Sequence, residues 1–267
     1  MSRKIYLKGA CVLKLILLSF ATWLPAVAAS KLEGRYSNST RPVNFGVLLF
    51  PTFQALDVFG PLDALNILSL SHPINLALIA ETLDPVNTAP ISPSMNMFNS
   101  NFSESVLPTH THDTAPPLDV LIVPGGLGTR APVSRLQPTL SYLESVFPDL
   151  CYLITVCTGA GLAARTGILD GLSATTNKRA WHETTALGPA VKWVPRARWV
   201  RSDESGGKVW SSSGVSAGVD ATLAWMAEVF GEAVADEVAA VMEWTRVRAW
   251  WDDPWAGHYN LTGQTKG

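Results

Sequence analysis

Cys157 stands where an apolar run meets a helical pattern, and this placement suits a reactive thiol. Residues 152–156 are apolar enough for a buried strand, and residues 158–165 follow with a helix pattern. A side chain at such a strand-to-helix turn is presented at the carboxyl edge of a sheet. Amide groups at the start of a helix favour the thiolate. The sequence therefore predicts nucleophilic chemistry at Cys157, although a small buried core cysteine fits the same position.

Two further features lie at the ends of predicted elements. Pro124-Gly125-Gly126 closes an apolar run, and its glycine N–H groups are candidate oxyanion donors. Asp57 begins a helical pattern after the first apolar run. Because the carboxyl ends of parallel strands meet at one edge of a sheet, we expect Asp57 to face the same crevice as Cys157. The plainer alternatives are an ordinary tight turn and an acid that caps a helix.

Strand-like runs alternate with helical patterns along the chain. Strands are predicted at 43–50, 75–80, 118–123 and 152–156, a hairpin at 199–200 with 209–212, and helices at 55–68, 136–147, 158–165, 216–230 and 233–244. The irregular stretch 83–117 is expected to hold a short strand pair around 91–98. This alternation predicts one α/β domain, a doubly wound and mostly parallel sheet with helices on both faces.

Composition narrows the class of protein. The chain has 267 residues, of which 47% are hydrophobic and 16% charged, enough for one large globular core. The net charge is −2 and no long basic run occurs, which argues against nucleic-acid binding. No metal-ligand or nucleotide-loop motif is present in the sequence, so we predict no cofactor and no metal.

The first residues indicate export. Arg3, Lys4 and Lys8 precede an apolar stretch, and small residues around Ala28 and Ala29 suit signal peptidase. The apolar run is too short for the ~20 residues of a membrane span, so we expect a cleaved signal at 1–29 rather than a stable anchor. A flexible leader at 30–42, a domain at 43–256 and a flexible tail at 257–267 follow.

Three glycosylation sequons and the cysteines are consistent with export through the secretory pathway. The sequons begin at Asn38, Asn101 and Asn260, as expected for a secreted eukaryotic, fungal glycoprotein. Cys151 and Cys157 belong to one strand-like run, where six residue steps separate them by ~20 Å. A disulfide needs Cα atoms within ~7 Å, so the two should not pair within one subunit.

Five blocks of the chain resemble, in order and spacing, the ThiJ/PfpI superfamily. They are Phe50 to Pro61 with Asp57, Asp119 to Gly126, Val156 to Gly159, Leu169 to Thr176, and Ser211 to Asp220. The resemblance implies a flavodoxin-like, class I glutamine amidotransferase-like fold with a nucleophile elbow at Cys157. It is closest to isonitrile hydratase-like members, which implies a small-molecule substrate and a homodimer.

The resemblance also implies roles for particular residues. Cys157 matches the nucleophile, Asp57 the acid beside it, and Thr158 a position where protease-like relatives carry His. Asn177 stands where relatives usually carry His, which removes the nearest imidazole base. His182, five residues further on, is a candidate substitute, although a solvated loop histidine is the favoured interpretation. Gly125, Gly126, Asn177 and Ser213 are expected to bind the oxyanion or the substrate.

The expected activity is hydration of an isonitrile to an N-substituted formamide. Cys157 would attack the terminal carbon and Asp57 would supply a proton to the nitrogen side. The alternatives are a glyoxalase-like or metabolite-modifying enzyme on the same thiol, and a non-catalytic secreted protein with a binding or redox-sensing cysteine.

Overall fold

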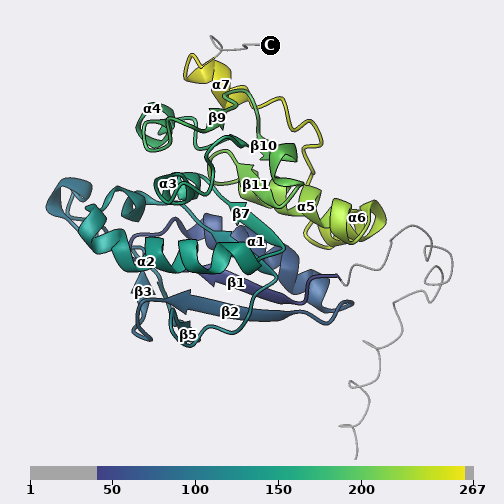
Figure 1. Ribbon diagram of the computed structural model, residues 1–267, viewed down its shortest axis with the longest axis horizontal. Helices are drawn as coiled ribbons and strands as arrows, with labels where there is room; N and C mark the ends of the chain where they lie inside the picture. Colours follow the sequence, from purple (N-terminus) through teal and green to yellow (C-terminus); the bar gives the residue numbers. More distant parts are fainter. Residues whose placement is uncertain (1–40, 262–267) are drawn as a thin grey trace, which may run out of the picture. The chain divides into compact units, whose positions relative to one another are not determined.

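The computed structural model describes residues 41–261. Its centre is a seven-stranded sheet in the order β10-β11-β7-β6-β1-β2-β5 (Figure 1). These strands are β1 (Asn44–Leu48), β2 (Asn75–Ala80), β5 (His110–Thr111), β6 (Val120–Val123), β7 (Tyr152–Thr155), β10 (Trp199–Arg201) and β11 (Val209–Ser212). All neighbours pair in parallel except β10 with β11. The predicted flavodoxin-like α/β fold is confirmed.

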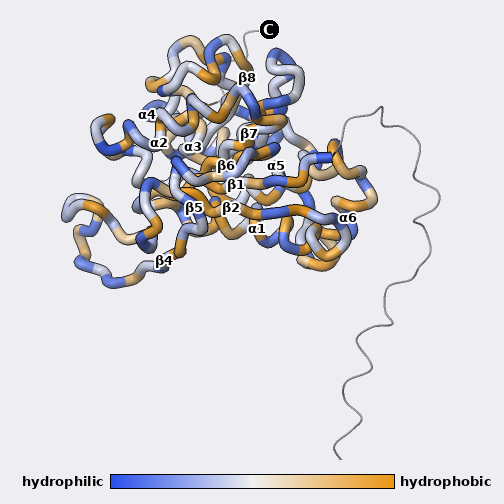
Figure 2. Tube along the Cα trace, turned by 60° about the horizontal axis from the view of Figure 1, so that its bottom comes forward, coloured by the Kyte–Doolittle hydropathy of each residue, from blue (hydrophilic) through white to orange (hydrophobic). Residues whose placement is uncertain are grey.

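Helices cover both faces of this sheet. On one face α1 (Ala55–Ser69), α5 (Ala217–Val229) and α6 (Glu232–Val241) pack together, whereas α2 (Val133–Val146) and α3 (Gly159–Arg165) pack together on the other (Figure 1). The strands between them are apolar on both sides because both sides are buried. Figure 2 shows these apolar strands at the centre of the domain. At the core, the ring of Trp225 on α5 meets those of Phe45 and Tyr152 edge to face.

The irregular stretch differs from the expectation. No strand pair forms around 91–98 among the described residues; Pro93–Met95 make a short 3₁₀ turn instead. Proline lacks an N–H group for a strand ladder, so pairing moves outward to β3 (Val86–Asn87) and β4 (Ser105–Val106), which are antiparallel. This pair and the loop it closes are set off from the main sheet (Figure 2).

A small cap lies beyond the carboxyl end of β7 (Figure 1). It contains β8 (Ser173–Ala174) paired in parallel with β9 (Lys192–Trp193), together with α4 (Trp181–Thr185) and α7 (Pro254–His258). The sequence did not predict these four elements. The expected tail also begins too early, because the boundary at 256 falls inside α7 and Leu261 is buried against Trp181 and Ala256.

The expected leader likewise ends earlier than predicted, since Pro42 is buried and the guanidinium of Arg41 lies 5.7 Å from the centre of the Phe230 ring. The signal at 1–29, the rest of the leader, the sequon at Asn38 and the tail from 262 lie outside the described residues. Asn101 and Asn260 are both exposed. No helix within residues 41–261 is long and apolar enough to cross a bilayer.

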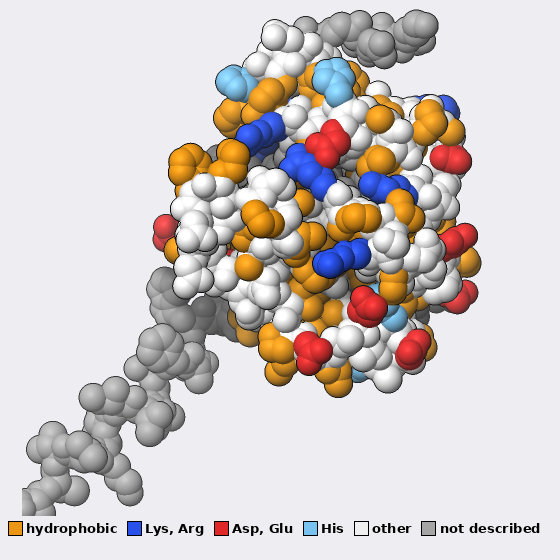
Figure 3. Space-filling view, turned by 90° about the vertical axis from the view of Figure 1, so that its left-hand side faces the viewer, with side chains coloured by type: hydrophobic (Ala, Val, Ile, Leu, Met, Phe, Trp, Pro, Cys, Tyr) orange, Lys and Arg blue, Asp and Glu red, His pale blue; other side chains and the backbone are white. Residues whose placement is uncertain are grey.

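Charges of both signs are interspersed on the surface. Figure 3 shows Lys and Arg side chains across the middle of one face, with acidic and apolar side chains among and around them. On the surface of the described residues, acids pair with several cations, including Arg130 with Glu183 at 2.7 Å and Lys192 with Glu204 at 3.1 Å. This face therefore offers no purely basic surface of the kind that a phosphate backbone requires.

Candidate active site

The chain bends sharply at Cys157, between β7 and α3. Its φ is +57°, in the left-handed region, which costs a residue other than glycine about 1–2 kcal/mol. Two contacts hold the bend: the Cys157 N–H donates to the Ser213 carbonyl at 3.1 Å, and the Thr176 hydroxyl donates to the Cys157 carbonyl at 2.8 Å. A Cβ on Gly159 would lie 2.2 Å from the Val123 carbonyl oxygen, so only glycine lets α3 begin here. The elbow is the turn that the sequence predicts.

The thiol is nearly buried, in polar surroundings. Cys157 is 4% exposed. The side-chain amide of Asn177 donates to its sulfur at 3.1 Å. The backbone N–H groups of Thr158 and Val215 also hydrogen-bond to the sulfur, and Val215 itself has a positive φ of 41°. Three N–H donors therefore converge on one sulfur atom.

Asp57 reaches the thiol from the first turn of α1. The side chain is fully buried, and its Oδ2 accepts a hydrogen bond from the Gly125 N–H at 2.9 Å. Its carboxyl group interacts with the Cys157 thiol. Oδ1 accepts no hydrogen bond from nitrogen or oxygen among the described residues. One carboxylate oxygen is thus fixed by the backbone, and the other has no hydrogen-bond partner within residues 41–261.

Burial sets the proton affinities of this pair. It raises the pKa of Asp57 to about 7, against the hydrogen bonds from Gly125 and Cys157. It also raises the pKa of Cys157 to about 12, and the charge of Asp57 adds to this increase. The expected thiolate is therefore wrong for the free protein. Loss of hydration outweighs the three donors and the short helix behind the sulfur, so the pair loses its first proton from Asp57 rather than from Cys157.

The two glycine amides support the site in a way the sequence did not predict. The Gly125 N–H is bonded to Asp57, and the Gly126 N–H donates to the Thr158 hydroxyl at 3.0 Å. Both amides are therefore already used within the protein, and either one must give up its partner to bind an oxyanion. The donors that already converge on the sulfur are Asn177, Thr158 and Val215.

Replacing Gly125 with Ala should damage the site from within. The added Cβ would lie 2.5 Å from the Thr158 backbone nitrogen and 2.9 Å from Asp57 Oδ2. We expect the free energy of unfolding in urea to fall by about 1–3 kcal/mol. Gly257→Ala is the matched control, because nothing lies within 4 Å of its Cβ position. Equal stability of the two variants would contradict this close packing.

The remaining predicted residues have different fates. The Thr158 hydroxyl hydrogen-bonds to Gly126 and Thr129 rather than to the sulfur. Its side chain therefore connects the elbow to the Pro124-Gly125-Gly126 segment, the glycine loop. Ser213 acts through its carbonyl, which fixes the elbow. The Asn177 side-chain amide lies at the thiol, which the sequence left open, and its Oδ1 accepts a hydrogen bond from the Ala180 N–H at 3.0 Å. His182 is exposed on α4 and makes no hydrogen bond to Cys157.

Two cavities among the described residues are lined by elements that also carry parts of the site. One of about 100 Å³ is lined by Thr158, Thr129, Arg130 and Arg165, among others. Another of about 760 Å³ runs along the outer side of α1, where Leu56 and Phe59 are exposed. Neither is lined by Cys157. No group of three His, Cys, Asp or Glu side chains within residues 41–261 is placed to hold a metal ion.

Comparison with solved structures gives the same fold. A ThiJ/PfpI family protein from Pseudomonas syringae superposes with a TM-score of 0.65, covering 86% of this chain and 85% of its own at 24% identity. DJ-1beta from Drosophila melanogaster gives a TM-score of 0.56 at 19% identity, over 76% of this chain and 98% of its own.

Sequence relatives agree with the structural ones. A scan against family models finds no match. The HTH-type transcriptional regulator GbdR of Pseudomonas aeruginosa is 27% identical over 143 residues, 54% of this chain but only 37% of the regulator. Isonitrile hydratase of Pseudomonas putida is 32% identical over 203 residues, 76% of this chain and 78% of that enzyme. With the elbow at Cys157 and the matching fold, this shared length places the chain in the ThiJ/PfpI superfamily, to which the DJ-1 proteins also belong.

Proposed function

We propose that this protein hydrates isonitriles, R–N≡C, to N-substituted formamides, with Cys157 as nucleophile and Asp57 as its proton carrier. The observation that carries the proposal is the buried pair itself. Burial raises the pKa of Asp57 to about 7, which suits a group that must both accept and donate a proton near neutrality. The identity with an isonitrile hydratase points to the same substrate class.

In the first half of the reaction the thiol adds to the isonitrile. The sulfur attacks the terminal carbon while the free oxygen of Asp57 takes the thiol proton, so the thiolate never has to persist in a buried site. The terminal carbon carries the lone pair of the isonitrile. Asp57 therefore returns the proton to that carbon, rather than to the nitrogen as first expected. The product is a thioimidate, R–N=CH–S, on Cys157, and Asp57 is a carboxylate again.

Water completes the cycle. The oxygen of water bonds to the thioimidate carbon while Asp57 takes a proton from that water. Asp57 then passes this proton to the nitrogen. The C–S bond then breaks, the hydroxyl proton returns through Asp57 to the sulfur, and R–NH–CHO leaves. The N–H groups of Asn177, Thr158 and Val215 stabilise the sulfur while it carries charge. The sum is one isonitrile and one water giving one formamide.

Asn177 and the thiol environment weigh against the other two functions. A glyoxalase-type reaction moves a proton between adjacent carbons and is helped by a second base, whereas a neutral amide donates to the sulfur here. A redox-sensing cysteine is typically an exposed, low-pKa thiol. Burial instead raises the pKa of Cys157, and the residue is 4% exposed.

A small substrate panel tests the proposal. The purified full chain is incubated with cyclohexyl isocyanide, benzyl isocyanide and methylglyoxal, and products are followed by NMR. We expect formamides from the isocyanides and no lactate from methylglyoxal. The value of kcat/KM should rise with pH and level off above the Asp57 pKa of about 7, because only the carboxylate accepts the thiol proton. Lactate without formamide would reject the hydratase in favour of the glyoxalase.

A further inference from the structure

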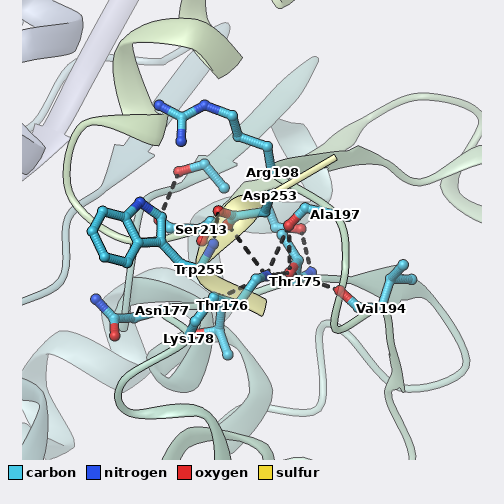
Figure 4. Close-up of polar contacts among 12 residues, drawn as sticks. Thr175, Thr176, Asn177, Lys178, Val194, Ala197, Arg198, Ser213, Asp253 and Trp255 are labelled. Carbon is cyan, nitrogen blue, oxygen red and sulfur yellow. Dashed lines mark hydrogen bonds and ion pairs between the residues drawn. The ribbon is translucent and has the colours of Figure 1, made fainter. Parts of the chain in front are cut away.

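The residue that contacts the thiol from the cap lies between two anchored neighbours. Asn177 follows β8, in the segment 175–178 drawn in Figure 4. On one side, the Thr176 hydroxyl donates to the Cys157 carbonyl at 2.8 Å, and the Thr175 N–H donates to the Ser211 hydroxyl at 2.9 Å. On the other side lies Lys178. Besides the Ala180 N–H that holds its Oδ1, the position of the Asn177 amide therefore depends on Thr176 and on what holds Lys178.

Lys178 is buried, 3% exposed, and points into the protein. Burial lowers the pKa of its ammonium group to about 7, against the charge of Asp253, so the side chain is a cation below neutral pH. Its Nζ donates to the Thr175 hydroxyl at 2.6 Å, the Ala197 carbonyl at 2.8 Å and the Thr176 carbonyl at 3.3 Å (Figure 4). The ammonium also lies 5.0 Å from the centre of the Trp181 ring. Each of its three protons has an acceptor, so Lys178 is built in as a tether and is not available as a nucleophile.

The countercharge comes from the far end of the chain. Asp253 is 4% exposed, and its Oδ2 lies 3.9 Å from Lys178 Nζ. Its Oδ1 accepts the Trp255 N–H and so caps α7, while its own N–H donates to the Arg196 carbonyl at 2.9 Å. Oδ2 has no hydrogen bond of its own within the described residues. The carboxylate therefore faces Lys178 through charge alone and joins α7 to the segment that carries Asn177.

Such a buried pair is a poor source of stability. Removing two charges from water costs about as much as their attraction returns, and apolar pairs of similar volume often do as well. In some proteins a buried ion pair instead fixes the alignment of the two segments that carry it. Here the aligned segment places a hydrogen-bond donor 3.1 Å from the sulfur.

We propose that Lys178 and Asp253 are positioning residues for the thiol: through this pair the C-terminal segment holds Asn177 against Cys157. Neither side chain touches the sulfur. The inference deepens the proposed function, on which its catalytic meaning rests. Its test uses the chemical reactivity of the thiol, so that it stands or falls separately from isonitrile hydration.

The test measures alkylation of Cys157 by iodoacetamide in the folded full chain, at pH 6.5, by peptide-resolved mass spectrometry. The exposed Cys151 in the same sample is the internal reference. Asn177→Leu removes the donor at similar volume, Lys178→Met removes the tether, and Asp253→Asn removes the charge but keeps a good helix cap. Losing the Asn177 donor raises the thiol pKa, so we expect alkylation to slow roughly tenfold, the ratio for one pKa unit.

Lys178→Met and Asp253→Asn should slow alkylation in the same direction. The double variant Asn177→Leu/Lys178→Met should be alkylated no more slowly than Asn177→Leu alone, because both substitutions act on the same hydrogen bond, from Asn177 to the sulfur. Lys192→Met and Asp252→Asn are the matched controls, being exposed residues of the same types. A merely structural pair would lower the melting temperature yet leave the folded thiol alkylating at the wild-type rate.

Wild-type rates in Lys178→Met and Asp253→Asn, or effects that multiply with Asn177→Leu, would overturn the proposal. So would an unchanged rate in Asn177→Leu itself. If the rates change as expected but the wild-type protein makes no formamide, the positioning role stands and the hydratase proposal fails.

Discussion

Cys157→Ala should abolish formamide production from isonitriles, with a loss of at least roughly 10³-fold in kcat, because the covalent route disappears with the sulfur. Asp57 alone cannot replace it, since a carboxylate is a poor nucleophile toward the isonitrile carbon. The variant should still fold. Ala fits the space, and both contacts that hold the elbow use the Cys157 backbone rather than its side chain.

Cys151→Ala is the matched control for this loss. Both cysteines are free, but Cys151 is exposed and precedes β7, whereas Cys157 is buried at the other end of that strand. Activity should be unchanged in Cys151→Ala. Mass spectrometry of the wild-type protein quenched during turnover should find the substrate mass on the Cys157 peptide only. Residual turnover near the wild-type rate in Cys157→Ala would remove the nucleophile and leave the fold without a function.

The sheet was predictable because its central strands are buried on both faces. β1, β6 and β7 are mostly apolar runs, and a run of that kind indicates burial without reference to distant residues. The cap was not predictable in the same way. β8 and β9 have two residues each and α4 has five, which is too short for any periodicity to register.

The site, like the fold, has features that the sequence predicts and features that it does not. The elbow at Cys157 and the acid at Asp57 follow from their places at the ends of strands, and both expectations meet in one buried pair. The state of the thiol did not follow. A helix N-terminus is visible in the sequence, but the burial that outweighs it arises only when α1, the glycine loop and the cap close around the sulfur. The sequence did not predict the Val215 N–H donor for a related reason. A positive φ is rare for a β-branched residue, so the residue type gives no sign of it.

Asp57→Asn should make the protein more stable at neutral pH. Burial raises the pKa of Asp57 from 3.8 to about 7, so the folded state holds a proton in this range that the unfolded state has released. The free energy of unfolding therefore falls as pH rises from about 4 to 7, by up to about 4 kcal/mol at ~1.4 kcal/mol per pKa unit. Asn carries no such penalty. Urea denaturation should show the variant gaining on the wild type between pH 4 and pH 7.5, whereas the exposed Asp63→Asn on the same helix should not.

The same substitution should separate thiol ionisation from catalysis. The charge of Asp57 helps to raise the Cys157 pKa, so Asp57→Asn should lower that pKa and speed alkylation by iodoacetamide. Turnover of isonitriles should nevertheless fall by about 10²–10⁴-fold, because no group remains to carry protons between sulfur, carbon and water. A thiol that becomes more reactive toward an alkylating agent and less active toward the substrate is the signature of a proton carrier. If turnover instead rose with alkylation, Asp57 would only restrain the nucleophile, and the proton transfers would need another residue.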